Sequence, residues 1–269
     1  MKHLTIVIII LCTNIVFAQS FEELIIKGDS LFMKQDYLKA VELYSKAIEI
    51  DSSKYDGYFR RGQAYFYDEN DKDAIKDYDK ALSINPNDSQ ILHLRGKSKK
   101  FIGDQSGALD DFSSAINADS SYAPAYIDRA WVFVSMQQWN AAWVYFNLGI
   151  QKDSNQTAQV YFTQGYCYQQ SSAYKQALDH YSIAIKLEPY YSDAYLNSGN
   201  CMVQLNRINE AFDFFDKALE LNPENSIIFY ARGLAAQKEG KMKKACADWL
   251  KAKELGNSNA ENALGQYCK

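Results

Sequence analysis

Few side chains in this sequence could bind a metal or act as a nucleophile. Beyond residue 18 the histidines are His93 and His180, which fall in different predicted helices. A zinc site needs three or four ligands around one point, so we do not expect these two to share one. The acidic run from Asp68 to Asp73 lacks the glycine at the sixth position and the glutamate at the twelfth of a calcium loop, and is interpreted as a solvated turn.

Sequence motifs for catalysis are also missing. The chain has no Gly-x-Ser-x-Gly elbow, Walker loop, zincin motif or dinucleotide fingerprint. Its 29 basic and 33 acidic residues are well mixed and give a net charge of −4, with no lysine and arginine block of the kind that binds nucleic acid. The sequence therefore predicts a protein that is not an enzyme, with no catalytic residue, metal site, cofactor or nucleic-acid partner.

Residues 1–18 have the pattern of a secretory signal peptide. A short basic start precedes the apolar run 4–17, and Val16 and Ala18 suit the two positions that a signal peptidase reads. Cleavage after Ala18 would leave Gln19 first, and the exported protein would lie in the periplasm, at the cell surface or outside the cell. An uncleaved membrane anchor is the alternative, although the run is shorter than the ~20 residues that span a bilayer. After cleavage no membrane span is expected.

One pattern recurs along the rest of the chain every 34 or 35 residues. Each copy has a small residue, an alanine twelve residues later, an aromatic residue four further on and another small residue three after that. In the second copy these are Gly62, Ala74, Tyr78 and Ala81, and Pro86 follows. The first small residue of the seven copies is Gly28, Gly62, Gly96, Ala130, Gly165, Gly199 and Gly233.

The elements that carry this pattern are pairs of helices. Ala74, Ile75, Tyr78, Ala81 and Leu82 form an amphipathic helical stripe. The small residues mark where the two helices of a pair cross closely, and proline ends the second helix because it cannot donate a helix hydrogen bond. One pair cannot bury its own apolar face, so neighbouring pairs must stack.

The period and the order of small, aromatic and proline residues resemble the tetratricopeptide repeat (TPR) over residues 21–259, and the type resembled is that of exported bacterial proteins. Segments such as AYFYDENDKDAIKDYDKALSINP look like that family. The resemblance implies an all-α fold, a right-handed superhelical solenoid of seven helix-turn-helix repeats plus a C-terminal capping helix. The sequence departs from the family at the position just before the first small residue of each repeat. The family often has leucine there, whereas five repeats of this chain have a basic residue: Lys27, Arg61, Arg95, Arg129 and Arg232.

We therefore expect residues 19–269 to form a single solenoid. Ser20 and Ser258 each begin a predicted capping box, one opening the first helix and the other the helix that covers the last repeat. The predicted repeats span 21–54, 55–88, 89–122, 123–156, 158–191, 192–225 and 226–259, and the capping helix spans 260–268.

The cysteines beyond residue 18 fall into two pairs. Cys167 and Cys201 hold equivalent sites 34 residues apart. Stacked helices lie about 8–10 Å apart, whereas a disulfide needs Cα atoms within about 7 Å, so these two are expected to replace small core residues. Cys246 and Cys268 lie on the last repeat and on the helix that should cover it. We predict a disulfide between them, because disulfides form and persist in exported proteins. The C-terminal stretch 245–268 also resembles the tail of other exported repeat proteins, which supports this pairing.

The resemblance implies that first helices line a concave face. The matching sites are unusually aromatic and nearly uncharged. They lack the lysine, asparagine and arginine set with which one TPR subfamily grips a C-terminal carboxylate. We expect this face to bind a ligand or peptide, although part of the rings could pack between neighbouring first helices instead. The candidate residues are Phe32, Phe59, Phe66, Tyr67, Phe101, Trp131, Phe162, Tyr166, Asn200 and Tyr230.

Three functions are compatible with these residues. The favoured one is an exported scaffold or adaptor that binds a protein or peptide in the concave aromatic groove, with possible envelope association. The alternative is an accessory protein that binds an envelope glycan or peptidoglycan, because aromatic rings stack on sugar faces. A third is an enzyme with a new site in the groove. The sequence does not identify the partner, because solenoid form does not imply function.

Overall fold

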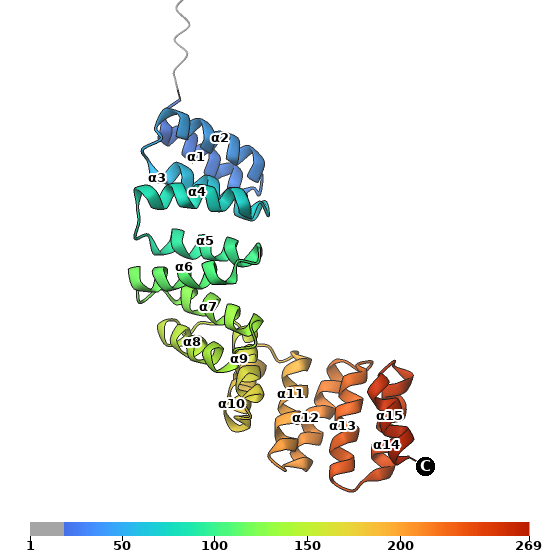
Figure 1. The fold of residues 1–269 in the computed structure, drawn as a ribbon. Helices are drawn as coiled ribbons and strands as arrows, with labels where there is room; N and C mark the ends of the chain where they lie inside the picture. Colours follow the sequence, from blue (N-terminus) through green and yellow to red (C-terminus); the bar gives the residue numbers. More distant parts are fainter. Residues whose placement is uncertain (1–18, 269) are drawn as a thin grey trace, which may run out of the picture. The chain divides into compact units, whose positions relative to one another are not determined.

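A computed structural model describes residues 19–268, and the predicted signal peptide 1–18 lies outside this range (Figure 1). The described residues form fifteen α-helices and no β-strand, which confirms the all-α fold. They divide into two compact units, one ending at Pro86 and the other beginning at Asn87. Each unit is described by itself, and the single solenoid over 19–269 stays a prediction.

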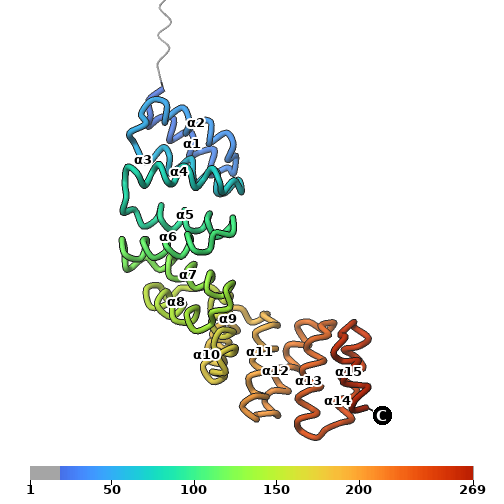
Figure 2. Tube along the Cα trace, in the orientation of Figure 1, coloured from blue at the N-terminus to red at the C-terminus, as the bar shows by residue number. Residues whose placement is uncertain are grey.

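Both units are built from helix pairs that follow one another along the chain, and each second helix lies back against its first helix (Figure 2). Unit 1 contains α1 (Phe21–Met33), α2 (Tyr37–Ile50), α3 (Tyr55–Tyr67) and α4 (Asp71–Ile84). Unit 2 contains α5 (Ser89–Phe101), α6 (Gln105–Ala118), α7 (Ala123–Ser135), α8 (Trp139–Lys152), α9 (Ala158–Gln170), α10 (Tyr174–Leu187), α11 (Ser192–Gln204), α12 (Ile208–Leu221), α13 (Ser226–Lys238), α14 (Met242–Glu254) and α15 (Ser258–Tyr267).

The turn inside each pair has one backbone conformation throughout. In the first pair Gln35 has φ 62°, its amide donates to Phe32 and the next amide donates back to Leu31. This is a Schellman motif, which satisfies the last carbonyls of the first helix. The residue with positive φ recurs at Gln35, Glu69, Gly103, Gln137, Ser172, Asn206 and Gly240. The acidic run Asp68–Asp73 spans one of these turns, between α3 and α4.

The small and aromatic residues of the repeat meet inside each pair. A Cβ atom added to Gly199 would come within 2.6 Å of the Phe215 ring, so the glycine is needed for the close crossing of α11 and α12. In repeat 4 Ala130 takes this place beside Phe146, and both are fully buried. The seven repeated rings are 0–1% exposed and form the core of the pairs: Tyr44, Tyr78, Phe112, Phe146, Tyr181, Phe215 and Trp249.

Buried ion pairs explain three of the four arginines that depart from the family pattern. Arg61 donates from Nε and Nη2 to the two carboxylate oxygens of Asp77, at 2.7 and 2.8 Å. Burial raises the pKa of Asp77, and the hydrogen bonds from Arg61 oppose that rise. The same bidentate pairing, sixteen residues apart, joins Arg95 to Asp111 and Arg232 to Asp248. Each pair ties a first helix to the second helix of its own repeat.

Repeats 4 and 5 fill these two positions differently. Arg129 lies over the Tyr145 ring at 4.4 Å, because the partner position holds no acid. Repeat 5 has Gln164 and His180 instead. His180 stacks on Tyr168 with ring centroids 5.1 Å apart, and burial lowers the pKa of its imidazole. Both repeats therefore replace the ion pair with aromatic contacts.

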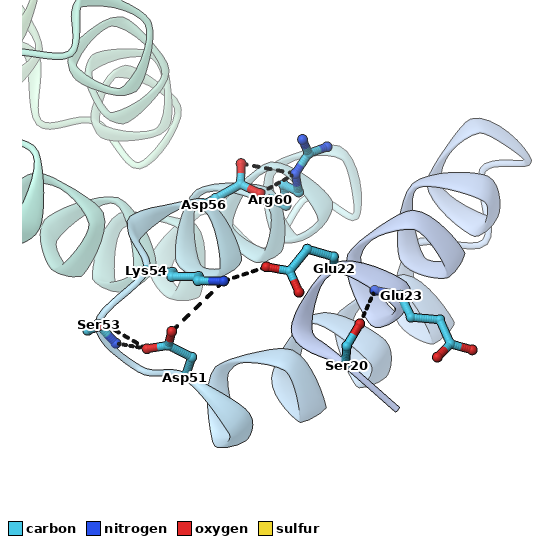
Figure 3. Close-up of polar contacts among 8 residues, drawn as sticks. All are labelled: Ser20, Glu22, Glu23, Asp51, Ser53, Lys54, Asp56 and Arg60. Carbon is cyan, nitrogen blue, oxygen red and sulfur yellow. Dashed lines mark hydrogen bonds and ion pairs between the residues drawn. The ribbon is translucent and has the colours of Figure 1, made fainter. Parts of the chain in front are cut away.

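The first helix of unit 1 is held by polar contacts at its N-terminal end (Figure 3). The Ser20 hydroxyl accepts a hydrogen bond from the Glu23 amide at 3.1 Å, which is the predicted N-cap. Lys54, just before α3, forms ion pairs with Glu22 at 2.5 Å and with Asp51 at 3.9 Å (Figure 3). Its ammonium also lies 4.4 Å from the centre of the Phe21 ring. These contacts link the start of α1 to the turn that enters α3.

At the end of unit 2, α15 packs on α14. Its N-cap is Asn257, whose side chain accepts from the Ala260 amide at 3.1 Å, one residue before the predicted cap at Ser258. Ala260 and Ala263 are buried in the core that α12 to α14 share. Cys246 and Cys268 lie at disulfide distance, with Cα atoms 5.8 Å apart.

Candidate binding groove

Three of the predicted ligand-binding rings meet around one hollow of unit 2. Trp131 of α7 and Phe162 and Tyr166 of α9 line a cavity of about 310 Å³, and α11 closes it with Leu196 and Asn197. We call this the aromatic hollow; its remaining lining residues are Val134, Thr163 and Asp193. All of these residues belong to first helices, so this hollow lies on the side where the sequence predicted the groove.

The rings of the aromatic hollow are held from behind by the core. Trp131 meets the buried Phe146 edge to face at 5.5 Å. Phe162 lies 5.6 Å from Tyr181 and 4.8 Å from Tyr191. Both rings are half-buried, and each packs against the core as well as lining the hollow. Among the residues that the structure describes, Tyr166 contacts no ring of the buried core; its ring meets the Trp139 ring edge to face, with centroids 5.7 Å apart.

A second hollow lies farther along α9 and α11, is also lined by α13 and the start of α10, and is rich in amides. It measures about 410 Å³ and includes Asn200, another predicted residue. Gln169 Oε1 accepts a hydrogen bond from Tyr181 at 2.6 Å, which leaves its amino group for another acceptor. We call this the amide hollow and the two together the first-helix groove; its other lining residues are Gln170, Tyr174, Val203, Gln204, Ala231, Leu234 and Lys238.

Charge is sparse in the groove. Asp193 is the only carboxylate among the lining residues of the two hollows. Lys238 is the only cation, and its ammonium donates to the Val203 carbonyl at 2.6 Å. Side-chain amides and aromatic rings, rather than charges, are thus the groups that a ligand would meet.

The other predicted residues lie elsewhere. In unit 1 Phe32 packs on the core of α1 and α2 and meets Tyr67 at 5.3 Å, and Tyr67 meets Phe66 at 5.4 Å. Phe59 is half-buried in α3. In unit 2 the Phe101 ring is 62% exposed, whereas Tyr230 packs against the core of α12 to α14. The structure therefore groups four of the ten predicted residues, Trp131, Phe162, Tyr166 and Asn200, along one groove.

The sequence prediction missed a row of lining residues. Thr163 and Asn197 both lie two residues before the glycine of their repeat, 34 residues apart, and both line the aromatic hollow. The 34-residue period could have found them, because a site that lines the groove in one repeat is repeated in the next.

The two histidines beyond residue 18, His93 and His180, are not among the lining residues of the groove. His93 is buried, contacts Asp128 at 2.7 Å and lies 3.2 Å from the Tyr122 hydroxyl. Burial raises the pKa of Asp128, but the His93 hydrogen bond and the charge of Lys100 hold it below its usual value. Within residues 19–268 no three histidine, cysteine, aspartate or glutamate side chains are grouped as metal ligands would be.

The two remaining cysteines are core residues. Cys167 and Cys201 are buried free thiols. Burial raises the pKa of each thiol to about 12, which keeps them protonated and unreactive.

Among the helices that the structure describes, none is long and apolar enough to cross a bilayer.

The repeated helix pairs define a class of protein, the helical-repeat proteins. Family models of the tetratricopeptide repeat match residues 55–88 and 192–225, and a TPR repeat model matches residues 28–68. The chain is a tetratricopeptide-repeat protein. A comparison with curated protein sequences finds no match.

Solved structures share this fold. The C-terminal part of a TPR repeat-containing protein from Cytophaga hutchinsonii has a TM-score of 0.70 at 20% identity, covering 89% of this chain and 99% of that one. YrrB, described as a TPR protein with an unusual peptide-binding site, has a TM-score of 0.64 at 21% identity, covering 69% and 96%. The pilF protein of Pseudomonas aeruginosa has a TM-score of 0.65 at 17% identity, covering 82% and 96%.

Proposed function

We propose that this protein is an exported, non-catalytic scaffold that binds a peptide segment of a protein partner in the first-helix groove. The observation that carries the proposal is the meeting of Trp131, Phe162 and Tyr166 around one hollow that continues into a row of amides. Aromatic side chains are frequent anchors of protein interfaces, and side-chain amides can bond to the backbone of an extended peptide. The peptide-binding site named for YrrB supports the same use of the fold.

The aromatic hollow fits the anchor of such a peptide. Its Trp131 and Phe162 rings are already held by Phe146, Tyr181 and Tyr191, so these two side chains lose little freedom on binding. An apolar side chain of the peptide would enter the hollow. The adjoining backbone would then lie over Gln169 and Asn200, which offer hydrogen bonds without requiring a charged ligand.

Replacing Trp131 and Tyr166 together with alanine is expected to weaken capture of the partner by tenfold or more, about 1.4 kcal/mol, because both are aromatic anchors. The measurement is pull-down from envelope extract, with affinity determined for the captured protein. Ile183→Ala/Tyr190→Ala is the matched control, since both side chains are exposed and lie outside the groove. Unchanged capture of the partner by the Trp131 and Tyr166 variant would contradict binding in the first-helix groove. Binding of the wild-type protein to a glycan array, without capture of a protein partner, would favour the envelope-glycan function.

Export predicts that the Cys246 and Cys268 thiols are oxidised to a disulfide. The bond would close 22 residues and stabilise the end of unit 2 by about 3 kcal/mol in the loop-entropy model. Replacing Cys268 with serine should therefore speed hydrogen exchange in α14 and α15, and leave α5 to α9 unchanged. Reduced wild-type protein should behave in the same way. Mass spectrometry of protein recovered from the cell envelope with both thiols free would contradict the bond.

A further inference from the structure

Repeat 6 leaves open the position that an arginine fills in other repeats. Arg61 reaches Asp77, sixteen residues ahead, and Ser45, sixteen residues behind, and Arg232 likewise reaches Asp248 and Asp216. The guanidinium thus lies between the second helices of two neighbouring repeats. In repeat 6 the corresponding residues are Ser198, with Phe214 ahead and Ser182 behind.

A cavity of about 620 Å³ lies where the arginine would be, and Ser182, Ser198 and Phe214 all line it. Its other walls come from α10, α11 and the turn before α12. None of its lining residues belongs to the first-helix groove. The Ser198 hydroxyl donates to the Ala194 carbonyl at 2.7 Å, so it is already satisfied. The size lies within the range of about 300–1,000 Å³ that is usual for small-molecule sites.

The walls of this cavity are mostly apolar. Leu178, Ile185 and Met202 provide aliphatic and thioether surface. Tyr195 and Phe214 add two rings, with centroids 6.4 Å apart. An apolar body of a ligand would therefore be removed from water on entering, which is favourable in proportion to its buried area.

The charges of the lining favour an anionic end on the ligand. The lining has two cations, Lys175 and Arg207, and one carboxylate, Asp179. Arg207 is already paired with Glu210 outside the lining, at 2.7 Å from Nε. Lys175 forms no ion pair in the part of the chain that the structure describes, and its ammonium can meet an anion at the edge of the apolar wall.

We propose that this cavity binds a small amphipathic anion, an apolar chain or ring that ends in a carboxylate. The apolar part lies against Phe214 and Met202, and the carboxylate lies near Lys175. The site is separate from the first-helix groove, so it could be occupied while a peptide is bound. A cationic ligand is the competing possibility, because Asp179 and the two rings also suit a cation.

Calorimetric titration with three probes that share a ten-carbon chain tests the proposal: decanoate, decanol and decyltrimethylammonium, each below its micelle concentration. Wild-type protein is expected to bind decanoate about fivefold more tightly than decanol. This difference is what one ion pair near the surface, between the carboxylate and Lys175, contributes to affinity. Ser198→Arg/Phe214→Asp recreates the ion pair of the other repeats inside the cavity, and should weaken decanoate binding at least ~tenfold by filling the space.

Lys175→Met keeps the cavity and removes only the cation, so it should bind decanoate and decanol equally. Lys186→Met, on the same helix but outside the lining, is its matched control and should bind like the wild type. The result does not depend on folding of the double variant, because Lys175 is exposed. Decanoate binding that neither change alters, stronger binding of decyltrimethylammonium, or no binding of any probe would overturn the proposal.

Discussion

Replacing Phe146 with alanine is expected to lower the free energy of unfolding of unit 2 by about 3–5 kcal/mol, the usual cost of removing a large ring from a packed core. The Phe146 ring is fully buried between α7 and α8 and meets Trp131 at 5.5 Å. Urea denaturation followed by circular dichroism measures the change. Val144→Ala on the same helix is the matched control, because Val144 is 38% exposed and its loss leaves no cavity.

The same substitution should also weaken partner binding, because the Trp131 ring loses the surface that holds it. Under conditions where the Phe146 variant is still folded, we expect reduced capture, whereas Val144→Ala should capture the partner normally. A stability loss below about 1 kcal/mol would contradict the packing described, since only exposed positions tolerate such truncation at so small a cost.

Replacing Asp248 with alanine is expected to destabilise the end of unit 2 by about 3 kcal/mol, because it leaves the Arg232 guanidinium without its main partner. The two side chains are 18% and 7% exposed, so water replaces the lost carboxylate only in part. Hydrogen exchange of α13 and α14, together with urea denaturation, measures the effect.

The double variant Arg232→Met/Asp248→Leu should be markedly more stable than Asp248→Ala alone, because it removes the unpaired charge as well. Glu210→Ala is the control: it breaks the ion pair with Arg207, whose side chains are 49% and 51% exposed, and should have a much smaller effect. If Asp248→Ala and Glu210→Ala lowered the free energy of unfolding by the same small amount, the buried ion pair would not link α13 to α14 as described.

The repeat pattern was enough to predict the fold because it reports contacts inside each helix pair. A glycine such as Gly199 and an aromatic residue such as Phe215 can recur sixteen residues apart only if they touch, and they do. The buried ion pairs were not predicted. Arg232 was noted as a departure from the family, but the acid sixteen residues later was not linked to it, since pairing depends on the crossing of two helices.

The lining residues of the two hollows were predicted only in part, for a reason of geometry. Helical periodicity shows which face of a single helix is apolar, but not how much of a ring its neighbour covers. Trp131 and Phe162 pack against the core and also line the hollow, whereas Tyr230 at a comparable site packs against the core and is not among the lining residues. The cavity near Ser198 depends on a residue that is missing from the pattern, so it becomes visible only when the second helices of two repeats are placed side by side.

The central claim is that a partner binds on the first-helix side of unit 2. The most direct test is photo-crosslinking from a benzoylphenylalanine placed at Tyr166 in the aromatic hollow, compared with one placed at Ile183 on α10. The proposed binding mode predicts that the partner captured from envelope extract crosslinks through position 166 and not through position 183. Crosslinking through position 183 alone, or equally through both, would contradict it.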